Sequence, residues 1–224
     1  MKTTEIGSRT CHIIINGNEL PTIYWGEMKD SSKIIEKVVA LCGDVKCNYI
    51  VYEVEDWNSD FSPWEFTLNK KMSFSGGGRN TLNWLTKECI TYCEKEYSLT
   101  GERILCGYSL AGLFSLWTFY ESQAFNGVIS CSSSLWFRNW LNYAESHTAP
   151  SNSSLYLSLG GREEKARDRI MATVGDSTRK QYELVCDDKN VSRYNLEWNE
   201  GGHFNEPEKR IAYGIRWIVK GVDD

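Results

Sequence analysis

Short runs of β-forming residues alternate with helical patterns along the whole chain, and this alternation constrains the fold more than any other feature. Six runs predict sheet strands, at 21–25, 48–54, 103–108, 127–132, 155–159 and 194–198. Apolar residues with helical spacing occur between and after them, near 33–42, 79–97, 109–122, 137–145, 163–186 and 206–219. The alternation predicts an α/β fold, with a mostly parallel sheet and helices on both faces. Catalytic and binding groups of such folds lie in loops beyond the carboxyl ends of the strands.

Two segments depart from this alternation. Residues 10–15 alternate into the turn Asn16-Gly17-Asn18, which predicts a hairpin with the strand that follows. Residues 55–78 are polar, aromatic and glycine-rich. A loop of that length inside a compact domain is usually functional.

Composition and charge limit the partners of the chain. The 224 residues contain four scattered prolines and no low-complexity segment, so we expect a single α/β domain over residues 1–224. The net charge of −5 gives no electrostatic reason to bind nucleic acid or an anionic membrane. No apolar run approaches the ~18 residues of a membrane-spanning helix. The N-terminus lacks the apolar region of a secretory signal, so we expect a cytoplasmic protein.

The eight cysteines predict thiols rather than disulfides or a metal site. Their close pairs are Cys42/Cys47 and Cys89/Cys93, and neither pair has the C-x-x-C spacing of zinc ligands. Disulfides need an oxidising compartment, which nothing in the sequence indicates. We therefore expect reduced, mostly buried thiols and neither a metal nor an organic cofactor.

The segment from Gly107 to Gly112, GYSLAG, carries the strongest chemical signal. It is a G-x-S-x-A-G variant of the G-x-S-x-G nucleophile elbow, with a predicted strand before it and an apolar helix after it. Residues two before and two after the serine must be small because the turn is sharp, and Gly107 and Ala111 meet that need. The turn exposes the Ser109 hydroxyl at a helix N-terminus, which favours negative charge. The alternative is an ordinary serine that caps a helix.

A serine nucleophile needs a base, and His203 is the candidate. A base is required because serine is a poor nucleophile at its free pKa. His203 follows the last predicted strand in the sequence EGGHF, where two glycines allow the turn that would set an imidazole above the sheet. His12 lies within a predicted strand and His147 in a polar loop, so we expect structural roles for both.

The base in turn needs an orienting acid, which we expect between the serine and the histidine in chain order. The strand 155–159 leads into Gly160, and Glu163 is the first acidic residue after it. Glu163 is therefore the preferred acid, with Glu164 and Asp168 as reserves. A simple role in the first turn of a helix, where acidic residues are favoured, is the alternative for Glu163.

Two backbone donors are needed for an oxyanion hole. One is the N–H of Leu110, which follows the serine. The second should come from the loop after the strand 21–25, where Gly26 allows a close backbone approach. The N–H of Glu27 is the candidate, and its side chain would play no part in that role. A plain acidic loop residue is the alternative.

Seven segments together resemble the putative esterase family of α/β-hydrolases, which includes esterase D-like enzymes, enterobactin-type siderophore esterases and mycolyltransferases. The segments are PTIYWG, DWNSDFSPW, GGG at 76–78, GYSLAGLFSLW, SCSSSLW, SLGGRE and GGHF, in the expected order. The resemblance implies an α/β-hydrolase fold and a triad of Ser109, Glu163 and His203. It also implies backbone oxyanion donors at Leu110 and Glu27.

Two features differ from the family pattern. Ala111 stands where the elbow usually has glycine, and Tyr-Trp-Gly precedes the oxyanion loop where many relatives have His-Gly. The chain also has no room for a large lid domain, so we expect a shallow pocket bordered by residues 55–78. Trp57, Trp64 and Trp136 are candidate substrate-binding walls, and core packing is the alternative for each.

The residues and the resemblance together predict a serine hydrolase that cleaves small-molecule carboxylic esters through an acyl-enzyme. An acyltransferase of the same fold and a non-catalytic ligand-binding protein are the alternatives, because a fold does not prescribe a function. A siderophore ester, a sugar acetate, an aromatic acyl ester and a short acyl thioester all remain open as substrates. The sequence does not indicate the oligomeric state.

Overall fold

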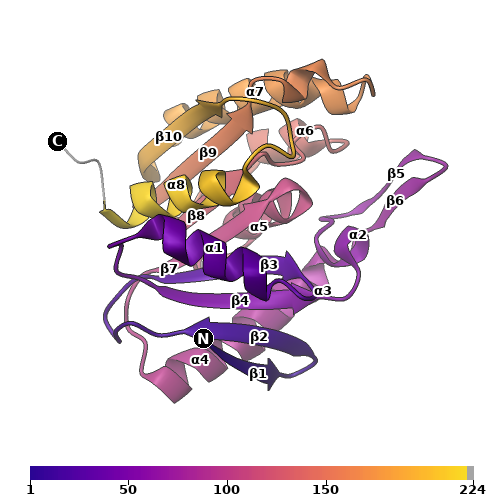
Figure 1. Ribbon diagram of the computed structural model, residues 1–224. Coiled ribbons are helices and arrows are strands. Elements are labelled where there is room, and N and C mark those ends of the chain that lie inside the picture. The colour runs from indigo at the N-terminus through magenta and orange to yellow at the C-terminus, as the bar shows by residue number, and fades with distance from the viewer. Residues whose placement is uncertain (221–224) are drawn as a thin grey trace.

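An eight-stranded sheet in the order β1-β2-β4-β3-β7-β8-β9-β10 forms the centre of the molecule, as described for residues 1–220 in a computed structural model (Figure 1). The strands are β1 (Lys2–Ile6), β2 (Arg9–Ile14), β3 (Thr22–Met28), β4 (Asn48–Val54), β7 (Arg103–Tyr108), β8 (Gly127–Cys131), β9 (Ser153–Gly160) and β10 (Val191–Asn199). The six strands from β4 to β10 in this order are parallel, and β2 and β1 extend the sheet antiparallel. The predicted mostly parallel α/β sheet is confirmed.

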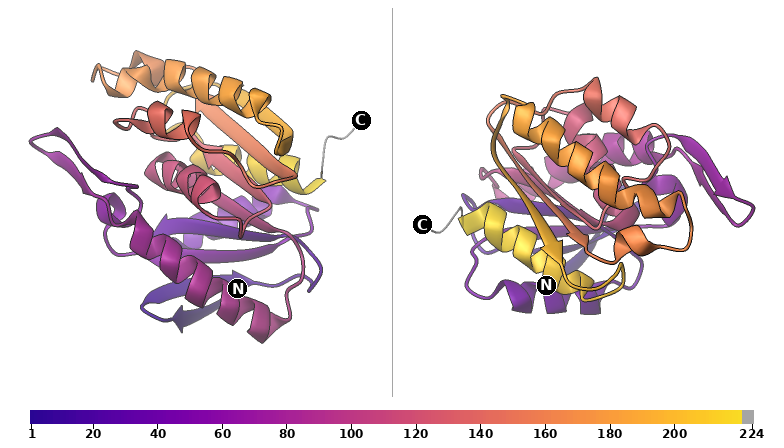
Figure 2. Two further views of the ribbon diagram at one scale, coloured as in Figure 1. Left: turned by 180° about the vertical axis from the view of Figure 1, so that it is seen from behind. Right: turned by 90° about the horizontal axis from the view of Figure 1, so that it is seen from above.

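Helices cover both faces of the sheet. One face carries α1 (Ser32–Cys42) and α8 (Pro207–Lys220). The other carries α3 (Gly78–Trp84), the π-helical turn η1 (Leu85–Cys89), α4 (Ile90–Tyr97), α5 (Ser109–Glu121), α6 (Trp140–Glu145) and α7 (Val174–Asp187). Figure 2 shows α7 and α8 on opposite sides of the sheet. No helix within residues 1–220 is long and apolar enough to span a membrane.

The core has two layers because the central strands are apolar on both sides, as is typical of parallel sheets. Successive residues of β3 alternate between the layers: Trp25 packs towards α1 and α8, and Tyr24 packs towards α5. Both side chains are fully buried. The prediction of mostly buried thiols is confirmed, since seven of the eight cysteines are buried and all are free.

The N-terminal hairpin differs from the prediction. β2 pairs with β1, which the sequence analysis missed, across a turn at Gly7, whose φ is 59°. On its other side β2 pairs with β4 rather than with β3, because β4 and β7 take both edges of β3. The turn at 16–18 instead docks on Asn48, whose side-chain amide donates to Gly17 O at 2.8 Å.

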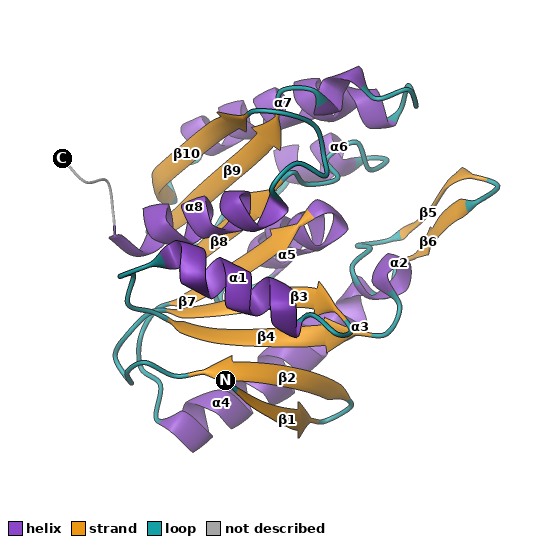
Figure 3. Ribbon diagram, in the orientation of Figure 1, coloured by secondary structure: helices purple, strands orange, loops and turns teal. Residues whose placement is uncertain are grey.

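Two further segments differ from the prediction: residues 55–78 contain more regular structure than expected, and residues 163–186 contain less helix. Residues 55–78 contain α2 (Trp57–Asp60) and a hairpin of β5 (Glu65–Asn69) and β6 (Met72–Ser75), which projects beyond the carboxyl ends of the sheet strands (Figure 3). Residues 163–186 begin with two 3₁₀ turns, η2 (Glu163–Lys165) and η3 (Met171–Thr173), before α7. The Glu163 side chain turns back to accept the N–H of Gly160.

Helix α8 packs unusually close to the sheet at Gly214. A Cβ atom at this position would lie 2.4 Å from Ile129 Cγ2 and 2.9 Å from Tyr156 Cδ1. We therefore expect Gly214→Ala to lower the free energy of unfolding by ~1–3 kcal/mol through overpacking. Alanine is ordinarily the better helix former by about 1 kcal/mol, so the expected sign is opposite to that of helix propensity.

Equilibrium urea unfolding measures this change. Gly161→Ala is the matched control, because a Cβ atom there meets only Asn199 O, at 3.7 Å. A Gly214→Ala protein as stable as the wild type would contradict the close packing of α8.

Candidate active site

Ser109 stands at the junction of β7 and α5 with a φ of 58°, in the left-handed region. Few residues other than glycine adopt this conformation, and those that do are often found at functional sites. A Cβ atom on Gly107 would lie 2.2 Å from Ala111 O, and one on Gly112 would lie 2.2 Å from Ser133 Oγ. The turn therefore needs glycine at 107, where the close contact is with backbone, and it has the sharpness expected of a nucleophile elbow.

Ser109, His203 and Glu163 form a continuous chain of hydrogen bonds. Ser109 Oγ lies 2.9 Å from His203 Nε2, and His203 Nδ1 lies 2.7 Å from Glu163 Oε2. A carboxylate can only accept, so Nδ1 carries the proton and Nε2 is free to accept the Ser109 hydroxyl. This arrangement of nucleophile, base and acid can remove the hydroxyl proton as the oxygen attacks.

Glu163 is a buried carboxyl group that stays ionised. Its residue is only 7% exposed. Burial opposes ionisation, but the hydrogen bond and charge of His203, together with the N–H of Gly160 at 2.8 Å, outweigh it. The pKa of Glu163 consequently lies below its usual value.

The two reserve acids lie elsewhere. Glu164 forms an ion pair with Arg179 at 2.8 Å. Asp168 accepts two backbone N–H groups of the turn that follows it, at 2.9 and 3.1 Å. Only Glu163 of the three candidates hydrogen-bonds His203.

The other two histidines make contacts within the fold. His12 Nε2 lies 2.9 Å from the Glu53 carboxylate, and the His147 ring stacks on Tyr143 with 3.9 Å between ring centroids. In the part of the chain that the structure describes, no three His, Cys, Asp or Glu side chains are grouped as a metal site.

Arg210 of α8 connects the acid to the histidine loop, and the sequence analysis missed it. Its residue is 2% exposed. Nη1 donates to Glu163 Oε1 at 2.8 Å, and Nη2 donates to the carbonyl oxygens of Glu200 and Gly202, at 3.1 and 2.8 Å. One guanidinium group thereby fixes the acid and the backbone directly before His203. A charged residue four positions before Gly214, on the helix face that packs on the sheet, is the signal that could have indicated it.

The loop that carries His203 is also held from two other directions. Gly201 has a φ of 84°, and the N–H of Gly202 donates to Asn205 Oδ1 at 2.8 Å. The Tyr108 hydroxyl, one residue before Ser109, donates to His203 O at 2.5 Å. The two glycines therefore supply the sharp turn that the sequence predicted.

The register of β3 determines which backbone N–H faces Ser109. β3 lies between the parallel strands β4 and β7, so successive residues bond alternately to the two sides. The N–H of Thr22 donates towards β7, to Glu102 O at 2.8 Å. The even-numbered residues therefore face β7, and the N–H of Glu27 faces β4. Met28 faces the β7 side, but it lies beyond Trp25, the last residue of β3 that pairs with β7. Its N–H donates to Glu27 Oε2 at 3.1 Å.

Two cavities meet at Ser109 and His203. The larger, of about 510 Å³, includes Leu110 and the aromatic side chains of Trp57, Trp136 and Phe74 in its lining. The smaller, of about 290 Å³, also borders on Trp57. Hairpin β5–β6 contributes to the larger cavity, and its Phe74 packs on Trp136 with 6.0 Å between ring centroids.

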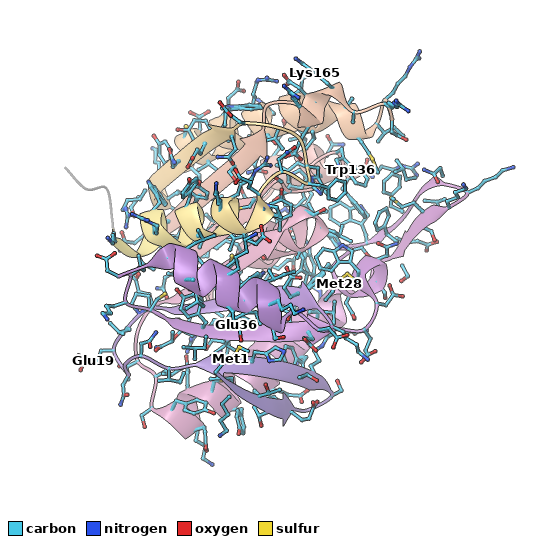
Figure 4. All side chains as sticks on the ribbon, viewed as in Figure 1. Met1, Glu19, Met28, Glu36, Trp136 and Lys165 are labelled. Carbon is cyan, nitrogen blue, oxygen red and sulfur yellow. The ribbon has the colours of Figure 1, made fainter. Side chains whose placement is uncertain are left out.

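Trp64 lines neither cavity and instead donates from Nε1 to Arg138 O at 3.0 Å. Of the three predicted tryptophans, the structure brings Trp57 and Trp136 to the site. Figure 4 labels Trp136 and Met28 at the edge of the molecule where hairpin β5–β6 projects.

Comparison with solved structures places the fold among esterases. A siderophore hydrolase EstA from Aspergillus nidulans is 15% identical, with a TM-score of 0.78 over 95% of this chain and 90% of that chain. An IroE-like serine hydrolase from Shewanella oneidensis is 16% identical, with a TM-score of 0.81 over 98% and 80%. An enterochelin esterase from Shigella flexneri is 13% identical, with a TM-score of 0.70 over 93% and 54%. These likenesses confirm the predicted α/β-hydrolase fold.

Comparison of sequences gives the family. No curated protein matches the chain. The family described as "Putative esterase" matches it over residues 17–207, which includes Ser109, Glu163 and His203. The chain belongs to this putative esterase family of carboxylic ester hydrolases.

Proposed function

We propose that the chain hydrolyses carboxylic esters of small molecules through an acyl-enzyme on Ser109, with His203 as the base and Glu163 as the acid. The observation that carries this proposal is the hydrogen-bonded chain from Ser109 through His203 to Glu163. Serine, imidazole and carboxylate in this order are what nucleophilic acyl transfer needs.

Each step of the reaction uses a group at the site. Ser109 Oγ attacks the acyl carbon while His203 Nε2 takes its proton, and Glu163 stabilises the imidazolium that forms. The imidazolium then protonates the alcohol that leaves. A water molecule, deprotonated by His203, attacks the acyl-enzyme and releases the acid and free Ser109. These steps require neither a metal nor an organic cofactor.

The oxyanion of the tetrahedral intermediate needs two N–H donors. Leu110 is the first, because its N–H opens helix α5 directly after Ser109 and its residue lines the larger cavity. For the second donor the register of β3 favours Met28 over the predicted Glu27, since the N–H of Met28 faces the β7 side of the strand. This N–H donates to Glu27 Oε2 in the free enzyme, so the oxyanion has to replace that carboxylate oxygen.

The larger cavity suits one bulky, apolar part of an ester. Trp57, Trp136 and Phe74 give it aromatic walls, and its size of about 510 Å³ is in the range of small-molecule sites. The structural relatives include siderophore hydrolases, so a siderophore ester is one substrate to test, beside aromatic acyl esters. The free thiols of the described residues suit a reducing compartment such as the cytoplasm.

Replacing the nucleophile gives the direct test of this proposal. We expect Ser109→Ala to lose at least ~10³-fold in kcat on any ester that the wild type cleaves, as deletions within triads do. Hydrolysis of a panel of esters that varies the acyl chain and the alcohol provides the measurement. A loss below tenfold would remove Ser109 from the nucleophile role.

Labelling by a fluorophosphonate probe separates catalysis from ligand binding. The wild type should take up one label at Ser109, and Ser109→Ala should take up none. Ser146→Ala, which changes a serine outside both cavities, serves as the control and should label like the wild type. Product analysis with excess alcohol distinguishes the hydrolase from an acyltransferase, because an acyltransferase would form the new ester.

Arg210 is expected to act as a positioning residue through Glu163. Arg210→Met leaves a buried carboxylate without its cation, and we expect a loss of ~10²-fold in kcat and a destabilisation of about 3–5 kcal/mol. Without the guanidinium, Glu163 stabilises the His203 imidazolium more strongly. The acid limb of the pH profile of kcat/KM should consequently move to higher pH.

The matched variant Arg210→Lys tests the charge separately from the shape. A lysine keeps the positive charge beside Glu163 but cannot span both Glu163 and the carbonyls of the histidine loop. It should therefore leave the acid limb in place and recover only part of kcat. An Arg210→Met enzyme, folded by circular dichroism, with an unshifted pH profile would contradict the role of Arg210.

A further inference from the structure

The smaller cavity differs in chemistry from the larger one. Aromatic side chains and carboxyl groups line it, and no lysine or arginine is among its lining residues. The aromatic side chains are Trp57, Tyr108 and Phe204, and the carboxyl groups belong to Glu27 and Glu208. Aromatic faces next to carboxylates form the environment in which proteins bind ammonium groups.

Glu27 is the unusual member of this lining. It is only 8% exposed, and no lysine, arginine or histidine of residues 1–220 forms an ion pair with it. Its Oε2 accepts the N–H of Met28 at 3.1 Å, and the Trp25 indole also favours its ionised form. A buried carboxylate without a cation is costly, and such groups usually have a partner.

Glu208, the other carboxyl group of this cavity, does have a cationic partner. Its carboxylate pairs with Lys37 at 3.0 Å. The two carboxyl groups thus border one cavity, but only Glu27 has a charge that nothing in the described chain neutralises. A cation that enters through the cavity would supply this missing partner.

We propose that the smaller cavity is a subsite for an ammonium group of the ester substrate, with Glu27 as its counter-ion. The subsite rests on the proposed esterase function, because Ser109 and His203 line both cavities. An ester bound at Ser109 extends its apolar part into the larger cavity and its cationic part into the smaller one. The substrate class is therefore a carboxylic ester that carries an amino or quaternary ammonium group near the ester bond.

The same arrangement makes Glu27 unfavourable for neutral esters. A carboxylate in a cavity that Ser109 also lines repels the negative charge that develops on the acyl oxygen. An ammonium group that pairs with Glu27 removes this repulsion in the complex. Selection for the cation then arises both from attraction to the cationic ester and from rejection of the neutral one.

The Glu27 carboxyl group gains and loses its proton near neutral pH. Burial, together with the nearby charge of Glu53, raises the pKa of Glu27 to about 7, although the N–H of Met28 and the indole of Trp25 lower it in part. The carboxylate is therefore mostly protonated at pH 6 and mostly ionised at pH 8. Preference for a cationic ester should increase over this interval.

Matched pairs of esters test the subsite. Butyrylcholine and 3,3-dimethylbutyl butyrate have the same shape and differ in one charge on the alcohol. Methyl 5-(trimethylammonio)pentanoate and methyl 6,6-dimethylheptanoate place the same difference on the acyl chain. The ratio of kcat/KM within a pair cancels any pH dependence that is common to both esters.

We expect the wild type to prefer the cationic ester of at least one pair by about tenfold at pH 8, and by less at pH 6. Glu27→Gln should reduce that ratio to within about threefold and remove its pH dependence. Glu208→Gln is the matched control, because it deletes a carboxylate of the same cavity that already has a cation, and the ratio should change little.

Three outcomes would overturn the subsite. The wild type could show no preference in either pair, Glu27→Gln could lower both esters of a pair equally, or Glu208→Gln could reduce the ratio as much as Glu27→Gln. In each case, cleavage of the neutral esters that depends on Ser109 would still support the proposed esterase function. An enzyme that cleaves no ester of the wider panel would instead contradict the esterase itself.

Discussion

The buried ion pair between Glu163 and Arg210 is the interaction on which the site depends. An isolated carboxylate at the depth of Glu163 would take up a proton, and a protonated acid could not stabilise an imidazolium. His203 and Arg210 hold the two oxygens of this acid, and the second nitrogen of Arg210 also holds the carbonyls of the loop that carries His203. Acid and base therefore share one support, and their 2.7 Å contact follows from it.

This support requires close packing that only small residues permit. A Cβ atom on Gly160 would lie 2.7 Å from Gly201 O and 2.8 Å from Arg210 Nη2, so the end of β9 must be glycine for the guanidinium to fit. At Gly214, one turn further along α8, the same helix approaches β8 and β9 without a side chain between them. The end of β9, helix α8 and the Glu163–Arg210 ion pair thus pack as one unit.

Local sequence was sufficient for the residues whose conformation depends on near neighbours. Ser109 could be found because a sharp strand-to-helix turn needs glycine two residues before it. His203 could be found because two glycines follow a strand that ends at the same edge of the sheet. Arg210 could not be found in this way, since its partners lie 8 to 102 positions away and only the closed sheet brings them together. The pairing of β2 with β4 escaped prediction for the same reason.

The oxyanion region illustrates where sequence reasoning reaches its limit. The sequence predicts a loop directly after residues 21–25, but β3 continues to Met28 and includes Gly26 and Glu27. Which of two consecutive N–H groups faces the serine depends on the register of β3 between its two neighbours, and a shift of one residue would reverse the answer. The same register turns the Glu27 side chain to the face of α1 and α8, where the smaller cavity lies. One structural variable, invisible in the sequence, therefore decides both which N–H group faces the β7 side of the strand and towards which face the Glu27 carboxyl group lies.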